Sequence, residues 1–243
     1  MADERALAGY EDWHAALDVD EGGTTPWQQM VIQIAGPLLQ GAKVMEIGCG
    51  RGGFVPSLLA AGARHVVAAD FSETAVAKAS AYASELQLEN AEFRVEDIEA
   101  INLPSEQFDV VVSCETIEHV PNPRQAISEL ARILNPGGYL VLTTPNYLSV
   151  VGMHRAWREL TGRPYTEGGQ PINHVTMLPR TLKWVREAGL KPLHAGSTGH
   201  SIPIPGRQGS AAEMSIPEFL RYPASWFGRH SIVVASKFAP GRL

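Results

Sequence analysis

Between residues 43 and 146, short runs of apolar residues alternate with longer stretches in which apolar residues recur every three or four positions. The short runs are rich in β-branched side chains and are bounded by Gly, Asp or Pro, a pattern typical of buried strands. They predict five strands, at residues 43–47, 65–69, 91–95, 108–113 and 139–143.

The longer stretches carry helix end signals. Ser72 can cap a helix over residues 73–86, and Asn122 followed by Pro123 opens another helix, which the NPGG sequence at 135–138 ends. Strands that alternate with helices form right-handed crossovers and a parallel sheet. The pattern therefore predicts an α/β, doubly wound fold.

The segments outside this region have a different character. Residues 1–40 contain a predicted helix at 25–39, and we interpret them as a helical cap. Residues 147–177 and 199–228 are too long for ordinary connections, which predicts lids, substrate-binding loops or the interface of a homodimer. One more helix and two strands are predicted at 179–188, 190–195 and 230–236. We expect a single domain over residues 1–243.

Composition narrows the class of protein. The 243 residues include 20 Lys+Arg and 26 Asp+Glu, and this acidic balance of −6 argues against a nucleic-acid binder. No stretch approaches the roughly 18 apolar residues of a membrane helix, and the acidic N-terminus lacks an apolar signal core. Two cysteines, Cys49 and Cys114, fit a reducing compartment. We expect a cytoplasmic protein that binds no nucleic acid and no membrane.

A glycine-rich turn follows the first predicted strand, in the sequence EIGCGRGG at residues 46–53. Glycines let the backbone turn tightly and approach a ligand, and the following helix N-terminus favours negative charge. Gly48, Gly50 and Gly53 fit the G-x-G-x-x-G pattern of dinucleotide sites and also the pattern E-x-G-x-G-x-G. The glycines alone therefore leave an NAD-linked oxidoreductase open.

Three acidic residues favour a different ligand. Glu46 lies just before the glycines, Asp70 ends the second strand about 20 residues later, and Asp97 follows the third strand. Asp70 can accept both ribose hydroxyls. Together the acids would repel a pyrophosphate and attract a ligand that carries a sulfonium and an ammonium group.

These motifs together resemble the class I S-adenosylmethionine (SAM)-dependent methyltransferases, closely over residues 43–146 and loosely over the last two strands. VMEIGCGRGGF resembles the first motif of that family, VVAADFS the second, and RVEDI the adenine-contacting motif. The resemblance implies a Rossmann-like, seven-stranded, mostly parallel sheet in which strand 230–236 is antiparallel. It also implies SAM as the cofactor.

The resemblance further assigns roles within the cofactor site. It implies that Gly48 and Gly50 pass near the methionine part, Asp70 holds the ribose, and Phe71 packs near the adenine. The side chain of Asp97 and the amide of Ile98 would contact the adenine edge. The full set of predicted cofactor-binding residues is Glu46, Gly48, Cys49, Gly50, Asp70, Phe71, Asp97, Ile98 and Cys114.

The catalytic candidates Glu115, Glu118 and His119 follow the fourth strand. If this turn is helical, they share one face within about 6 Å of each other. His119 is then a general base whose pKa the carboxylates raise, or the three side chains bind a divalent cation, or the turn is purely structural. The E-x-x-E-H pattern resembles ubiquinone-pathway O-methyltransferases and small-RNA 2′-O-methyltransferases. That resemblance implies a cation (Mg²⁺, Mn²⁺ or Zn²⁺) held by Glu115, Glu118, His119 and His174.

The long segment from residue 147 is mildly basic. Residues 147–190 contain six Lys and Arg against three acids, whereas residues 66–146 contain four against thirteen. Planar cationic donors bind oxygens and aromatic faces stack on sugars. The predicted acceptor-binding residues are Tyr147, Arg155, Arg158 and Tyr165. A solvated helix packed on the sheet edge is the alternative for this segment.

The sequence therefore predicts a SAM-dependent O-methyltransferase of a small polyhydroxyl acceptor, with a saccharide favoured and a divalent cation assisting. One alternative is an O-methyltransferase of a phenolic or catechol precursor of quinones, with His119 as a metal-free base. Another is a SAM-binding module without turnover.

Overall fold

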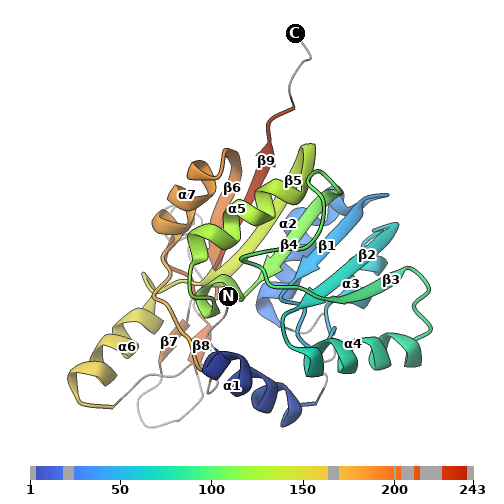
Figure 1. Cartoon of the computed structure of the whole chain (residues 1–243). Helices are drawn as coiled ribbons and strands as arrows, with labels where there is room; N and C mark the ends of the chain where they lie inside the picture. Colours follow the sequence, from blue (N-terminus) through green and yellow to red (C-terminus); the bar gives the residue numbers. More distant parts are fainter. Residues whose placement is uncertain are drawn as a thin grey trace.

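A seven-stranded sheet forms the centre of the computed structural model, which describes residues 4–18, 25–163, 170–199, 201–203, 211–213 and 226–239. The strand order is β3-β2-β1-β4-β5-β9-β6 (Figure 1). The strands are β1 (Lys43–Ile47), β2 (His65–Asp70), β3 (Ala91–Val95), β4 (Phe108–Cys114), β5 (Leu134–Pro145), β6 (Leu190–Thr198) and β9 (His230–Lys237). Strands β1 to β5 pair in parallel, and β9 runs antiparallel to both β5 and β6. The predicted fold class is confirmed.

Helices cover both faces of the sheet (Figure 1). The helices are α1 (Glu4–Ala15), α2 (Pro26–Leu39), α3 (Val55–Ala60), α4 (Glu73–Glu85), α5 (Pro123–Ile133), α6 (Val150–Leu160) and α7 (Leu178–Glu187), with a 3₁₀ turn η1 (Ile117–His119). A two-stranded sheet pairs β7 (Ser201–Pro203) with β8 (Ala211–Glu213). No helix among the described residues is long and apolar enough to span a membrane.

Both faces of the central strands are buried, which explains their continuous apolar sequence. Val44 of β1 packs with α2 and α3 on one face, whereas Met45 and Ile47 pack with α5 and α7 on the other. This alternation follows from the two-residue period of a strand. The sheet thus lies between two hydrophobic layers, and its strand ends are left to form a site.

The predicted helix starts are confirmed by their capping hydrogen bonds. The side chains of Ser72 and Asn122 accept from the backbone N–H groups of Ala75 and Gln125. At the start of α2, Thr25 and Gln28 form a capping box, which satisfies two otherwise unpaired N–H groups.

Strand β5 begins earlier than the apolar pattern indicates. Leu134 already pairs with Phe108, and the register shifts before Tyr139 pairs with Val110. Residues 135–138 therefore end α5, as predicted, but as an irregular part of the strand rather than as a separate loop. The apolar pattern missed this part because its polar and Gly residues do not alternate.

The C-terminal part of α1 is held against the N-terminal half of α4 by hydrogen bonds. The carboxylate of Glu11 accepts hydrogen bonds from the N–H groups of Glu73 and Thr74, at the N-terminus of α4. In return, the Lys78 ammonium donates to the carbonyls of His14, Ala15 and Leu17 at the C-terminal end of α1. The two charges complement the dipoles of the helix ends that they contact.

The predicted bounds of the helical cap, residues 1–40, and of the inserted segments, residues 147–177 and 199–228, stay predictions.

Candidate cofactor and acceptor site

A cavity of about 340 Å³ opens at the carboxyl ends of β1, β2, β3 and β4. Its size falls within the usual range of small-molecule sites, and its place is where open α/β sheets bind ligands. All nine residues predicted to bind the cofactor line it: Glu46, Gly48, Cys49, Gly50, Asp70, Phe71, Asp97, Ile98 and Cys114. The fold thus brings together residues that are up to 68 positions apart in the chain.

The glycine-rich turn brings the backbone close to Thr116, another residue that lines the cavity. Gly48 has a φ of +77°, and a Cβ atom there would collide with the side chain of Thr116. The N–H of Gly50 donates to the carboxylate of Asp70 over 2.9 Å. Only glycine fits at position 48, because both its backbone conformation and the space beside it exclude a side chain.

Two buried carboxyl groups lie beside this turn. Asp70 accepts a second hydrogen bond from the N–H of Ser72, at 3.1 Å. Burial raises the pKa of Asp70, and nearby His14 opposes that rise. Glu46 is 4% exposed, and its Oε2 atom has no hydrogen-bond partner among the described residues. Burial and then the charge of Asp70 raise the pKa of Glu46 to about 8. A cationic ligand would relieve both effects.

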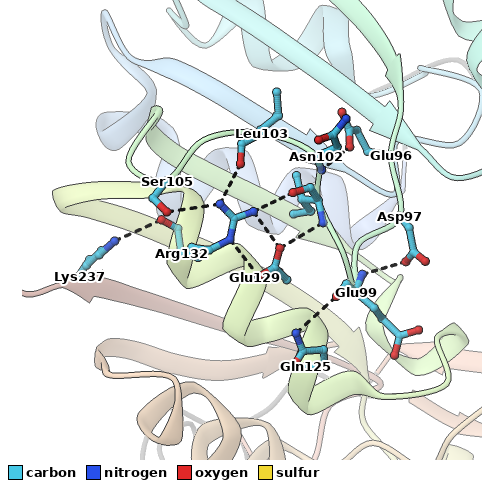
Figure 2. Close-up of polar contacts among 11 residues, drawn as sticks. Glu96, Asp97, Glu99, Asn102, Leu103, Ser105, Gln125, Glu129, Arg132 and Lys237 are labelled. Atoms are coloured by element: carbon cyan, nitrogen blue, oxygen red, sulfur yellow. Dashed lines mark hydrogen bonds and ion pairs between the residues drawn. The ribbon is translucent and has the colours of Figure 1, made fainter. Parts of the chain in front are cut away.

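The loop after β3 carries Asp97 into the cavity wall. One oxygen of the Asp97 carboxylate accepts from the N–H of Glu99 over 2.9 Å. Figure 2 shows how α5 holds the rest of this loop. Arg132 donates to the carbonyls of Ile101 and Leu103, both at 2.8 Å, and Glu129 accepts from the N–H of Ile101. Arg132 and Glu129, which form an ion pair at 2.8 Å on α5, therefore hold the loop that follows Asp97.

The N-terminal helices supply lining residues that the sequence analysis missed. Tyr10, Trp13 and His14 of α1 line the cavity, as do Trp27 and Gln28 of α2. The ring of Tyr10 packs edge-on against Phe71, with centroids 5.1 Å apart. The spacing of Tyr10, Trp13 and His14 places three ring side chains on one face of a helix. This spacing is the sequence signal from which their place in the cavity lining could have been predicted.

The residues after β4 do not form the predicted helix. Glu115 has a φ of +50°, and only Ile117–His119 forms a 3₁₀ turn. Glu115 therefore points to His230, with Oε2 and Nδ1 2.9 Å apart. Glu118 is fully buried and does not line the cavity, and its Oε1 lies 3.6 Å from Nε2 of His119. The expectation that all three side chains share one helix face is wrong.

His119 does line the cavity, in an environment unlike the predicted one. Its Nδ1 lies 2.7 Å from the carbonyl oxygen of Ile172, so Nδ1 carries the proton. Burial lowers the pKa of His119, and the Ile172 contact and the charge of Glu115 only partly oppose this. The expected rise in its pKa is wrong, because desolvation outweighs the carboxylates.

Comparisons with known proteins agree with this geometry. Residues 45–142 match the model of the methyltransferase domain family. The chain is 35% identical over 108 residues to a ubiquinone biosynthesis O-methyltransferase of Coxiella burnetii, across 44% of this chain and 45% of that protein. It is 29% identical over 187 residues to a protein of the same name from Leptothrix cholodnii, across 73% and 76%. The chain thus spans about half the length of the Coxiella relative.

A SAM-dependent methyltransferase of Thermotoga maritima superimposes with a TM-score of 0.62 at 20% identity, over 96% of this chain and 97% of that chain. This likeness concerns the fold. The family match and the O-methyltransferase relatives decide the class. Residues 45–142 belong to a SAM-dependent methyltransferase domain.

The methyltransferase domain does not gather the four predicted cation ligands. His174 is exposed and absent from the cavity lining, and its N–H donates to the carbonyl of Glu118 over 2.8 Å. Glu115 is turned to His230, away from Glu118. Among the described residues, no group of three or more His, Cys, Asp or Glu side chains could hold a metal ion. The predicted set of Glu115, Glu118, His119 and His174 does not fit a cation.

Three of the four predicted acceptor-binding residues, Tyr147, Arg155 and Arg158, do not line the cavity. Tyr147 is buried and its hydroxyl contacts Asn173 at 3.1 Å. Arg155 stacks on the Tyr147 ring, donates to Glu159, and donates to the carbonyl of Asn173. These contacts fasten α6 to the chain near residue 173. Arg158 is half-buried on α6, and Tyr165 lies outside the described residues. The role of all four in acceptor binding stays a prediction.

Proposed function

We propose that this protein transfers the methyl group of SAM to a hydroxyl oxygen of a small-molecule acceptor. The observation that supports this most directly is the acidic cavity around the glycine turn, with Glu46 and Asp70 buried in its wall. A bound SAM would supply a positively charged sulfonium and an electrophilic methyl group. The relatives named O-methyltransferases support oxygen as the methyl acceptor.

The residues of this chain would hold SAM along the strand ends. Asp70 would accept the ribose hydroxyls, and Asp97 with the amide of Ile98 would contact the adenine. Glu46 and the backbone at Gly48 would face the charged methionine end. The Glu46 carboxyl oxygen that lacks a hydrogen-bond partner among the described residues fits this group, and so does the glycine turn that lines the cavity beside it. Tyr10 and Phe71 would exclude water from the adenine side.

For the acceptor, a phenolic or catechol hydroxyl now has more support than a saccharide. The saccharide prediction depended on the cationic and aromatic side chains of the insert, and two of these, Tyr147 and Arg155, are engaged with each other. The lining is instead rich in aromatic and apolar side chains, including Trp13, Trp27 and Ile172. A flat ring would pack well against such a wall.

The test is production of S-adenosylhomocysteine from SAM with catechol, phenol or methyl glucoside as the acceptor, in EDTA and in Mg²⁺. Turnover of catechol or phenol that is equal in EDTA and Mg²⁺ is the expected result. Turnover of methyl glucoside alone would restore the saccharide, and dependence on added Mg²⁺ would show that ligands other than the predicted four bind a cation. Tight SAM binding without turnover of any acceptor would favour a binding module.

A further inference from the structure

Tyr10 of α1 joins two parts of the cavity wall that follow different strands. Its ring packs edge-on against Phe71, which directly follows β2, with the ring centroids 5.1 Å apart. Its hydroxyl lies 3.3 Å from the carbonyl oxygen of His119, in the turn after β4, and 3.4 Å from that of Ile172. All four residues line the cavity. Because β1 lies between β2 and β4 in the sheet, Tyr10 reaches from one side of the glycine turn to the other.

The hydroxyl group of Tyr10 acts as a hydrogen-bond donor. The side chain is buried, and burial raises the pKa of Tyr10 to about 12, so the hydroxyl keeps its proton at neutral pH. A carbonyl oxygen only accepts, so the two carbonyls share this one proton. Both distances exceed the roughly 2.7–2.8 Å of a single O–H···O bond, as expected for a shared donor.

The segment that carries Ile172 is held between α1 and η1. The carbonyl oxygen of Ile172 lies 2.7 Å from Nδ1 of His119 as well as near the Tyr10 hydroxyl. The preceding residue, Pro171, packs on Gly9 of α1, where an added Cβ atom would lie only 2.9 Å from Cγ of the proline. Residues 170–177 form neither helix nor strand. The position of Ile172 therefore depends on contacts with the neighbouring elements.

Helix α1 can respond to a ligand in the cavity. It lines the cavity with Tyr10, Trp13 and His14, so a bound cofactor would lie against it. Its hydrogen bonds to α4 run through the side chains of Glu11 and Lys78. A ligand that orders such a helix lowers the entropic cost for a second ligand that needs the same helix in place.

The second ligand in this case is the acceptor. Asp97, on the adenine side, follows β3, whereas η1 follows β4 at the other side of the glycine turn. The wall formed by η1 and Ile172 is therefore the part of the cavity that lies away from the adenine-side residues.

We propose that Tyr10 is a positioning residue that couples the cofactor site to the acceptor site. Bound SAM orders α1, and the Tyr10 hydroxyl then fixes Ile172 in the wall that the acceptor meets. The inference rests on the proposed function, because it needs SAM in the cavity and an acceptor beside η1.

Hydrogen–deuterium exchange with and without S-adenosylhomocysteine tests the coupling. In the wild type, this ligand should slow exchange both in α1 and in residues 170–174. Tyr10→Phe keeps the ring against Phe71 and removes only the hydroxyl, so the ligand should slow exchange in α1 alone. The control is Tyr82→Phe, which should behave as the wild type because Tyr82 is half-buried on α4 and does not line the cavity.

Gly9→Ala tests the same contact from its other side. Alanine favours a helix more than glycine does, so the variant stabilises α1 itself while the new methyl group displaces Pro171. The protection of residues 170–174 by S-adenosylhomocysteine should then be lost, as in Tyr10→Phe, and that of α1 should remain. Gly36→Ala makes the same exchange in α2, where nothing lies within 4 Å of the added carbon, and should keep both.

Kinetics separate positioning from packing. For the acceptor that the wild-type protein methylates, Tyr10→Phe should raise KM about 3–10-fold, the usual effect of one hydrogen bond between uncharged groups. The Kd of SAM should stay within about twofold. An unchanged KM would overturn the proposal, and so would equal weakening of SAM and acceptor binding together with loss of protection in α1.

The exchange data also distinguish a failure of the coupling from a failure of the proposed function. They need no acceptor, so they decide even if the wild-type protein methylates none of catechol, phenol and methyl glucoside. Protection of α1 without residues 170–174 in the wild type overturns the coupling alone, as does protection of both in Tyr10→Phe. If S-adenosylhomocysteine slows exchange nowhere in the wild type, the proposed function fails and the coupling fails with it.

Discussion

The buried carboxyl group of Glu46 should make the stability of the cofactor-free protein depend on pH. Its pKa rises from an ordinary 4.5 to about 8 because the group is buried and lies near Asp70. A difference of one between the pKa values of the folded and unfolded chains corresponds to about 1.4 kcal/mol. The rise in the pKa of Glu46 thus corresponds to a loss of about 5 kcal/mol in the free energy of unfolding once the carboxyl is ionised in both states.

The sign follows from which state holds the proton. Below pH 4.5 both states are protonated and Glu46 carries no penalty. As the pH rises through 4.5 toward 8, the unfolded chain releases the proton and the folded protein keeps it, so stability is lost. The loss reaches about 3 kcal/mol at pH 7. Glu46→Gln removes the titration while it keeps the size of the side chain.

Urea unfolding of the SAM-free protein at pH 5 and pH 8 measures this effect. The advantage of Glu46→Gln over the wild type should grow by about 3 kcal/mol between the two pH values. The matched control is Glu92→Gln, since the Glu92 side chain is 48% exposed on β3 and should show no such growth. Equal pH dependence of the wild type and Glu46→Gln would refute the reasoning.

The same residue links stability to cofactor binding. If the cationic end of SAM lies beside Glu46, binding should expel the proton and ionise the carboxyl. Calorimetry at pH 7 in buffers of different ionisation enthalpy should then show release of about one proton per SAM by the wild type and none by Glu46→Gln. The variant should be more stable and yet bind SAM more weakly, a combination that a defect in folding does not produce.

Three other changes test separate parts of the site. If Asp70 accepts the ribose hydroxyls as proposed, Asp70→Ala should weaken SAM binding by about 1–3 kcal/mol in calorimetry; unchanged affinity would refute that role. Lys78→Met should speed SAM dissociation in stopped-flow measurements, because the carbonyls of His14, Ala15 and Leu17, at and just after the end of α1, lose their donor, whereas exposed Lys183→Met on α7 should not. Arg132→Met should weaken SAM binding by releasing the loop after Asp97, and it should leave the fluorescence of Trp13 and Trp27 unchanged; an unaltered SAM affinity would argue against that link.

Local sequence signals predicted the parallel half of the fold well. The strands at 43–47 and 91–95 have the predicted bounds, and the helix starts at Ser72 and Asn122 form as expected. Each signal depends on neighbouring residues, since burial on both faces requires an apolar run and a helix start requires an acceptor side chain. The nine residues predicted to bind the cofactor all line the cavity for the same reason, because strand ends in a parallel sheet share one edge.

The motif after β4 shows where such local reasoning stops. The spacing of Glu115, Glu118 and His119 gives a shared face only if the backbone is α-helical. The left-handed conformation of Glu115 sends its carboxylate to His230 instead, and burial reverses the expected change in the pKa of His119. Neither the partner nor the burial of a side chain is encoded within its own segment.

The sequence by itself therefore determined the alternation of strands and helices over residues 43–146, the glycine turn and the acids that surround it, because these depend on local pattern and on the common edge of a parallel sheet. Only the tertiary structure decided that α1 lines the cavity and that His174 does not. It also decided that the antiparallel strand β9 sets His230 against Glu115. Those placements depend on contacts between segments more than 100 residues apart, and on desolvation that the whole fold creates.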